Sequence, residues 1–343
     1  MYTMLNRENL LESDELKKIV FIGIILVSVL FYNLKESKNE EKILSKSEVS
    51  NGNIVYDANK ESTDIENFEQ IRIGDTKDYV LSLIGKPARI DQSEYNFKWY
   101  VYNQYKENFV MIGIKDDVVV GLYTNFINSR EIDNVSINDN KKIVIENYDP
   151  LEYKKKGNTR YIINSNNQYD IVKEDNKYIT FFYDIYEENR VCSYQIISND
   201  AELSLSTMYP NPSEELKKSF ELQVIDLVNS VRYQRDLNDL KYSKKATISS
   251  RKHIQDMMRK KYFDHTNKEN KSPFDRMKAE DIIYMNAGEN IAAGQTSAIY
   301  AHEAWMNSEG HRKNILGDYN NIGVGVAFGG HYNIYYYNSP KFL

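Results

Sequence analysis

The hydrophobic positions of residues 67–200 follow a strand-like pattern. Three runs are rich in β-branched and aromatic residues and are separated by turn-forming residues: 97–102, 109–114 and 118–123. Such runs are typical of antiparallel strands. Before them, Asp75 or Thr76 can cap a short helix that Gly85 and Pro87 would close. We expect one helix followed by an antiparallel meander.

The same plan recurs further along the chain. Val135-Ser-Ile-Asn-Asp139 echoes Ile71-Arg-Ile-Gly-Asp75, and the strand-like runs 178–186 and 190–197 echo residues 109–123. A repeated sequence element of this length indicates a repeated structural unit. An ancient duplication is one explanation, and coincidence in a sequence rich in Tyr, Ile and Asn is the other.

The pattern becomes helical after Tyr209-Pro-Asn-Pro212, which interrupts any regular element. Apolar residues recur every three or four positions through 216–231, as on one face of a helix. Three further helices are expected, over 244–261, beginning at 272, and over 296–307. A final hairpin of strands 322–328 and 332–338 is expected after them. Helices around a small antiparallel sheet give an α+β class.

Composition limits the possible functions. With 343 residues, 41% of them hydrophobic, the chain has room for about two folded domains. The chain has 44 Lys and Arg residues and 50 Asp and Glu residues, and its basic residues form no dense cluster in the sequence. No nucleic-acid partner is therefore expected. Cys192 is the single cysteine, which excludes an intramolecular disulfide and a Cys-based zinc motif.

The N-terminus contains a candidate membrane segment. Residues 19–32 are uncharged and follow Lys17 and Lys18, as in an export signal. No small-x-small cleavage site follows, so residues 1–34 are interpreted as an uncleaved anchor helix, with the cell membrane as partner. A secreted protein with a cleaved signal is the alternative. Residues 35–66 are polar and are expected to form a flexible linker.

Five short sequence motifs occur in the C-terminal part of the chain. They are Asn229-Ser-Val-Arg232, Tyr262-Phe-Asp-His265, Gly288-Glu289-Asn290-Ile291-Ala292, Glu303-Ala-Trp-Met306 and Ser308-Glu-Gly-His311-Arg-Lys-Asn314-Ile-Leu316. With these motifs in this order, residues 215–343 resemble the CAP domain of cysteine-rich secretory, antigen 5 and pathogenesis-related proteins, in its cysteine-poor bacterial form. The resemblance implies an α-β-α sandwich. It also implies a position outside the cell for the C-terminal domains.

Residues 67–200 are similar to the accessory domain that precedes bacterial CAP domains. The matching motifs are Gly74-Asp75-Thr76, Gly85-Lys86-Pro87 and Trp99-Tyr-Val-Tyr102. The expected architecture is thus a smaller α+β domain over 67–200, of one unit or two repeated helix-plus-meander units, a linker over 201–214, and the CAP domain.

The resemblance implies a cleft that carries His265, Glu289, Glu303 and His311. Two imidazoles and two carboxylates around one cleft could bind a ligand, with His265 and His311 as ligands of a divalent metal such as Zn²⁺. If the site is hydrolytic, Glu289 or Glu303 would act as general base. A paired tetrad without metal is the alternative, and no catalytic residue is assigned.

Other polar residues have structural interpretations. Asn229, Arg232 and Arg276 are expected to tie helices together, His253 to face the core, and Cys192 to be a small core or edge residue. His302 is expected to point away from Glu303, because neighbouring helical residues lie about 100° apart, and His331 is interpreted as a turn residue.

The sequence therefore predicts an extracytoplasmic, membrane-tethered protein whose His/Glu cleft binds a small molecule, a peptide or a cell-wall ligand. Two alternatives stay open at this point. One is a metal-assisted hydrolase of peptide or wall polymer, and the other is a structural interaction module of the envelope.

Overall fold

The computed structural model describes residues 65–104, 108–126, 132, 134–329 and 334–342. The predicted anchor over 1–34, nearly all of the predicted linker over 35–66, and His331 lie outside the described residues. Within the described part, no helix combines the length and the apolar character needed to cross a bilayer.

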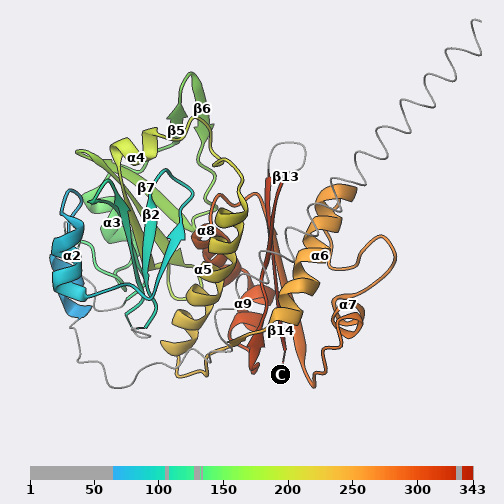
Figure 1. Cartoon of the computed structure of the whole chain (residues 1–343). Helices are drawn as coiled ribbons and strands as arrows, with labels where there is room; N and C mark the ends of the chain where they lie inside the picture. The colour runs from blue at the N-terminus through green and yellow to red at the C-terminus, as the bar shows by residue number, and fades with distance from the viewer. Residues whose placement is uncertain (1–64, 105–107, 127–131, 133, 330–333, 343) are drawn as a thin grey trace, which may run out of the picture. The chain divides into compact units, whose positions relative to one another are not determined.

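The N-terminal domain is built on a seven-stranded antiparallel sheet (Figure 1). Its strands are β1 (Arg89–Gln92), β2 (Lys98–Tyr102), β3 (Val110–Lys115), β4 (Val118–Thr124), β7 (Tyr169–Glu174), β8 (Lys177–Asp184) and β9 (Arg190–Ser198), in the order β1-β2-β3-β4-β9-β8-β7. The helices are η1 (Ile65–Gln70), α2 (Lys77–Ile84), α3 (Lys141–Asn147) and α4 (Asn199–Leu203), and a separate hairpin joins β5 (Tyr153–Lys156) to β6 (Thr159–Ile162). The predicted meander is confirmed, whereas β1, β7 and the hairpin were not expected.

The two halves of this sheet share one backbone plan. In the first half the amide of Gly74 donates to Val119 O at 2.8 Å, and in the second the amide of Asn138 donates to Val191 O at 2.8 Å. Thr76 and Asn140 cap α2 and α3 through their side chains. Since β4 pairs with β9, the two helix-plus-meander units meet at the centre of the sheet. The repeat seen in the sequence corresponds to equivalent backbone hydrogen bonds in the two units.

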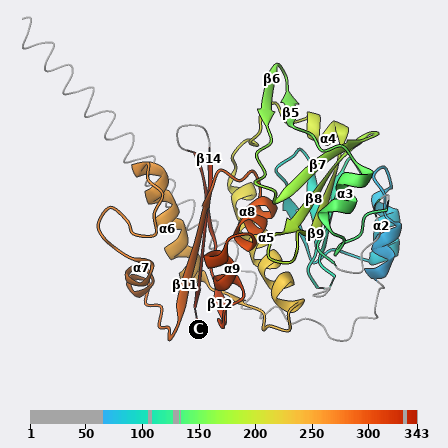
Figure 2. The same cartoon turned by 180° about the vertical axis from the view of Figure 1, so that it is seen from behind.

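The C-terminal domain is an α-β-α sandwich, as predicted. Its strands are β10 (Lys241–Tyr242), β11 (Ala287–Ala293), β12 (Asn321–Ile322), β13 (Gly325–Gly329) and β14 (Ile334–Phe342), ordered β10-β12-β14-β11 with β13 also paired to β14. Its helices are α5 (Glu214–Tyr233), α6 (Lys244–Lys260), α7 (Pro273–Ala279), α8 (Ala298–Met306) and α9 (Glu309–Ile315). Figures 1 and 2 show α6 and α7 on one face of this sheet and α5, α8 and α9 on the other.

Two glycines permit α6 to lie directly against β13. A Cβ at Gly323 would stand 2.3 Å from the backbone of Ala246, and one at Gly325 would stand 2.6 Å from the amide nitrogen of Arg251. Both distances are far below any normal contact, so any side chain at these positions would push the helix off the sheet.

The layer formed by α5 and α8 belongs to both domains. One continuous hydrophobic core joins Trp99 and Phe182 of the N-terminal sheet to Phe220 of α5 and Trp305 of α8. The helices α2 and α3 cover the opposite face of the seven-stranded sheet, in a second core. Because α5 and α8 bury apolar side chains against two sheets, we expect the two domains to unfold as one cooperative unit.

A core truncation tests this expectation. Phe220→Ala should lower the free energy of unfolding by about 3 to 5 kcal/mol, since it opens a cavity in the shared core. In denaturation followed by fluorescence, a Trp305→Phe background reports on Trp99 and a Trp99→Phe background reports on Trp305, and both midpoints should move together.

Tyr242→Ala serves as the matched control, because Tyr242 is 56% exposed, and it should leave both midpoints in place. A Phe220→Ala variant that shifts the Trp305 signal alone would show that the domains unfold independently.

Candidate functional site

Glu289 is the centre of a buried polar cluster in the C-terminal domain. It lies on β11, and its side chain is 4% exposed. Its Oε1 is 2.9 Å from His265 Nδ1, and Arg276 donates to both carboxylate oxygens at 2.9 and 2.7 Å. Both bonds from Arg276 come from its Nη2, and a carboxylate held by a guanidinium nitrogen and by an imidazole is fixed in position and orientation.

The start of α7 places Arg276 in this cluster. Ser272 and Asp275 form a capping box, and Pro273 opens the helix, so the first turn is well defined. Arg276 also donates to the backbone oxygens of His265 and Lys271, at 2.7 and 3.0 Å. One guanidinium therefore closes the loop that carries His265 and pairs with the buried carboxylate.

Electrostatics favour the ionised form of Glu289. Burial by itself would raise the pKa of Glu289, but the hydrogen bond from His265 and the charge of Arg276 outweigh burial and hold it below the usual value of 4.5. Behind the cluster lies His253 on α6, which is 1% exposed and faces the core as predicted. Burial, assisted by Arg276, lowers the pKa of His253.

His311 is attached to the other face of β11. Its Nδ1 lies 2.9 Å from Ser308 Oγ, and its backbone oxygen accepts from Asn290 Nδ2 at 3.0 Å. Asn290 follows Glu289 directly, and successive side chains of a strand point to opposite faces. The contacts of His311 and those of Glu289 thus lie on opposite sides of the strand.

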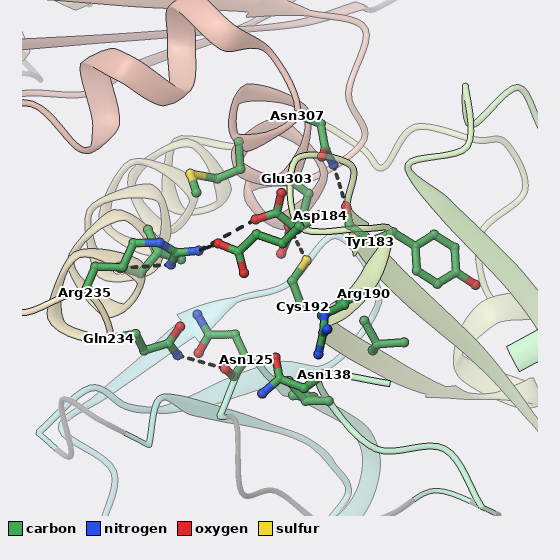
Figure 3. Close-up of a pocket in the computed structure, with 15 residues that line it drawn as sticks. Asn125, Asn138, Tyr183, Asp184, Arg190, Cys192, Gln234, Arg235, Glu303 and Asn307 are labelled. Atoms are coloured by element: carbon green, nitrogen blue, oxygen red, sulfur yellow. Dashed lines mark hydrogen bonds and ion pairs between the residues drawn. The ribbon is translucent and has the colours of Figure 1, made fainter. Parts of the chain in front are cut away.

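Glu303 faces the N-terminal domain. It lies on α8 and is 6% exposed. Ser193 Oγ donates to its Oε1 at 2.6 Å, Tyr123 Oη to the same oxygen at 3.4 Å, and Cys192 Sγ to its Oε2 at 3.4 Å. Figure 3 shows the carboxyl group of Glu303 beside Cys192. All three donors belong to the N-terminal domain, so Glu303 forms part of the domain interface.

A cavity of about 200 Å³ adjoins this interface (Figure 3). Glu303, Cys192 and Asn125 are among its lining residues. Burial raises the pKa of Glu303, and the hydrogen bonds from Ser193 and Cys192 offset only part of that effect. Burial and the nearby Glu303 likewise raise the pKa of the Cys192 thiol. The environment therefore favours a neutral acid at position 303 and disfavours a reactive thiolate.

The structure brings two of the four predicted cleft residues into contact, His265 and Glu289. Among the described residues, no group of three or more His, Cys, Asp or Glu side chains is arranged to hold a metal ion. Arg276 already neutralises Glu289, and a cation placed beside a guanidinium is repelled. The cluster therefore fits a divalent metal poorly, and Zn²⁺ on His265 and His311 stays a prediction.

The sequence interpretation did not place Arg276 in the cleft. Arg276 was expected to tie helices together, and it does connect α7 to β11, but it also sets the charge of the site. Asn229 and Arg232 do hold elements together, because they bond backbone oxygens of Leu240, Asn238, Ile315 and Gly317. Arg276 could have been noticed as the nearest arginine, 13 positions before Glu289.

Comparison with known families assigns both domains. Residues 73–208 match the CAP-associated N-terminal family, and residues 225–338 match the cysteine-rich secretory protein family. The chain is 28% identical over 313 residues to YlbC of Bacillus subtilis, which is named as an uncharacterized membrane protein, and this match covers 85% of the chain and 88% of that relative. It is also 45% identical over 113 residues to YkwD of the same organism, covering 33% of the chain and 44% of YkwD.

Solved structures show the same fold. An extracellular protein containing an SCP domain from Bacillus anthracis superposes with a TM-score of 0.67 at 23% identity, covering 82% of this chain and 96% of that one. A cysteine-rich secretory protein from Staphylococcus aureus superposes with a TM-score of 0.64 at 14% identity, covering 79% and 91%.

The two glutamates should respond oppositely to pH. Glu289→Gln should lower the free energy of unfolding at pH 7 by about 3 kcal/mol, because Arg276 is left without its counter-charge. That loss should shrink as the pH falls below about 4.5, since Glu289 of the unfolded wild-type chain then binds a proton while the folded carboxylate still resists protonation.

Glu303→Gln should instead raise the free energy of unfolding at pH 7. A carboxyl group whose pKa is higher in the folded protein than in the unfolded chain lowers stability once the pH rises above the unfolded-state pKa. The extra stability of Glu303→Gln should therefore vanish near pH 4. Urea denaturation of wild type and both variants at pH 4 and pH 7 measures the effects. Equal pH profiles for the two variants would contradict this assignment.

Proposed function

This chain is a bacterial CAP-superfamily protein with a CAP-associated N-terminal domain, and from that premise we propose that it is tethered to the cell membrane and binds a ligand outside the cell. The binding group is the cluster of His265, Glu289 and Arg276. One observation supports this proposal above others: a charge-paired, buried carboxylate orients an imidazole whose side chain is 48% exposed.

The chemistry of the cluster suits recognition of a polar group. With Nδ1 of His265 donating to Glu289, neutral His265 presents Nε2 as an acceptor for an N–H or O–H of a ligand. When it is protonated, the same nitrogen donates to an anion. Because Glu289 and Arg276 neutralise each other, the ligand meets a positioned imidazole instead of a strong net charge.

Membrane attachment rests on the N-terminal sequence and on one relative. Residues 19–32 are uncharged and follow two lysines, and the relative YlbC is named as a membrane protein. A run of 14 residues spans roughly 21 Å as a helix, so residues on both sides would complete the crossing.

Ligand retention tests the proposed site. Full-length protein purified in mild detergent is analysed by native mass spectrometry and by elemental analysis. His265→Ala should reduce the occupancy of any copurifying ligand at least about tenfold, because it removes the only solvent-facing group of the cluster. Thr266→Ala is the matched control in the same loop and should retain the ligand.

Two results would contradict this proposal. Full ligand retention by a folded His265→Ala variant would remove the cluster as the binding group. Stoichiometric zinc in wild type that is lost in both His265→Ala and His311→Ala would favour the predicted metal site in its place.

Surface exposure tests the location. External protease added to intact cells should degrade a C-terminal epitope tag on the chain, while a cytoplasmic marker stays intact. Replacing residues 1–34 with a cleavable signal peptide should release the protein into the medium, because the anchor is then removed. Protection of the tag in intact cells would overturn the proposed orientation.

A further inference from the structure

The β5–β6 hairpin reverses the usual distribution of polar and apolar residues. Lys154 and Lys156, two positions apart on β5, have side chains only 9% and 2% exposed, whereas Ile162 on β6 is 75% exposed. Lysine is rarely buried unless it is paired. A hairpin that buries two lysines and exposes an isoleucine indicates that the buried charges have a role beyond folding.

The two buried lysines share a single carboxylate. Glu202 on α4 accepts from Lys154 at 3.0 Å, from Lys156 at 2.7 Å and from Tyr95 Oη at 2.9 Å. Burial alone would raise the pKa of Glu202, but the two lysines lower it to about 2, so it carries a full negative charge. Two ammonium groups thus share one carboxylate, and burial lowers the pKa of Lys156.

The other carboxyl groups nearby are hydrogen-bonded to neutral side chains instead of the lysines. Glu94 and Glu303 line the same cavity, and burial raises the pKa of both, which favours their neutral forms. Arg160 adds a further positive charge to the lining. Lys154 and Lys156 therefore share Glu202 as their carboxylate partner, and a carboxylate entering the cavity would supply a second one.

These groups line a cavity of about 610 Å³ between the N-terminal domain and the start of α8. Aromatic rings form one of its corners: Tyr300 meets Tyr169 at 5.2 Å and 84°, and Phe182 at 5.1 Å and 73°. Among the described residues, Gln295 Oε1 is a buried acceptor without a hydrogen-bond partner, and it belongs to the same lining. The hairpin projects above α4 in Figure 1.

We propose that this cavity is a second binding site, distinct from the His265 cluster, and that it holds a short sugar chain carrying a carboxylate. The carboxylate pairs with Lys154 and Lys156, a hydroxyl or amide N–H donates to Gln295, and a sugar ring rests on the aromatic corner.

Each part of the cavity matches one part of such a ligand. An aromatic face attracts the weakly positive C–H groups of a sugar ring. The volume lies within the range of small-molecule sites, which combine apolar walls with a few polar groups. The loop between β6 and β7 adds several amide side chains to the lining, and these suit the many hydroxyl groups of a sugar better than the single carboxylate of a simple anion.

Calorimetry on full-length protein in detergent tests this site with three probes. The first is the disaccharide of N-acetylglucosamine and N-acetylmuramic acid, which carries a carboxylate. The second is the matched neutral disaccharide of N-acetylglucosamine, and the third is triglutamate. The carboxylated sugar should bind at least about tenfold more tightly than either of the others, a difference of ~1.4 kcal/mol.

Variants locate the binding. Lys156→Met should weaken binding of the carboxylated disaccharide at least about tenfold, whereas Lys155→Met is the control on the opposite, exposed face of β5 and should not. Gln295→Leu provides a variant outside the charged network, since it removes an acceptor that has no partner, and it should also weaken binding. His265→Ala should leave the affinity for the carboxylated disaccharide unchanged. The two proposed sites are therefore tested by separate variants, and one proposal can be rejected without the other.

Several results would overturn the proposal. Equal affinity for the neutral disaccharide would remove the role of the lysines, and equal or tighter binding of triglutamate would remove the role of the sugar. No measurable binding of the carboxylated disaccharide at about 1 mM, or full affinity in a folded Lys156→Met or Gln295→Leu variant, would reject the site.

Discussion

Packing of α5 and α8 between two sheets is the constraint on which the remaining structure depends. Each helix buries apolar residues on both sides, and together they fill the space between the two sheets. The interface between the domains is therefore a core and not a loose contact, unlike the more polar interfaces of mobile domains. This explains why polar groups at the interface, Glu303 above all, can be placed with the accuracy of interior residues.

The two glutamates show how environment decides chemistry. Glu289 and Glu303 are equally buried, but only Glu289 has a guanidinium beside it. Burial beside a counter-charge keeps a carboxylate ionised, whereas burial that is only partly offset by hydroxyl and thiol donors favours the neutral acid. One residue type consequently serves as a fixed anion in the C-terminal domain and as a hydrogen-bonded acid between the domains. The buried lysines of β5 present a different case, in which two ammonium groups share the carboxylate of Glu202.

Much of the fold follows from local pattern. The change from two-residue to helical periodicity after Pro212 separates the domains, and the echo of residues 71–75 in 135–139 corresponds to equivalent hydrogen bonds around Val119 and Val191. The edge strand β1 and the β5–β6 hairpin escaped notice for a physical reason. Their sequences are short and rich in charged residues, and such segments carry no periodic apolar signal.

The sequence by itself determined the class of each domain, and its family resemblance implied one cleft for His265, Glu289, Glu303 and His311. Only the tertiary structure decided the partners of the charged groups. Glu303 bonds Ser193, 110 positions away in the chain, and Lys156 pairs with Glu202 across 46 positions. Periodicity reports which face of an element is apolar, but the free energy of a buried charge depends on its neighbours in space, which no local pattern specifies.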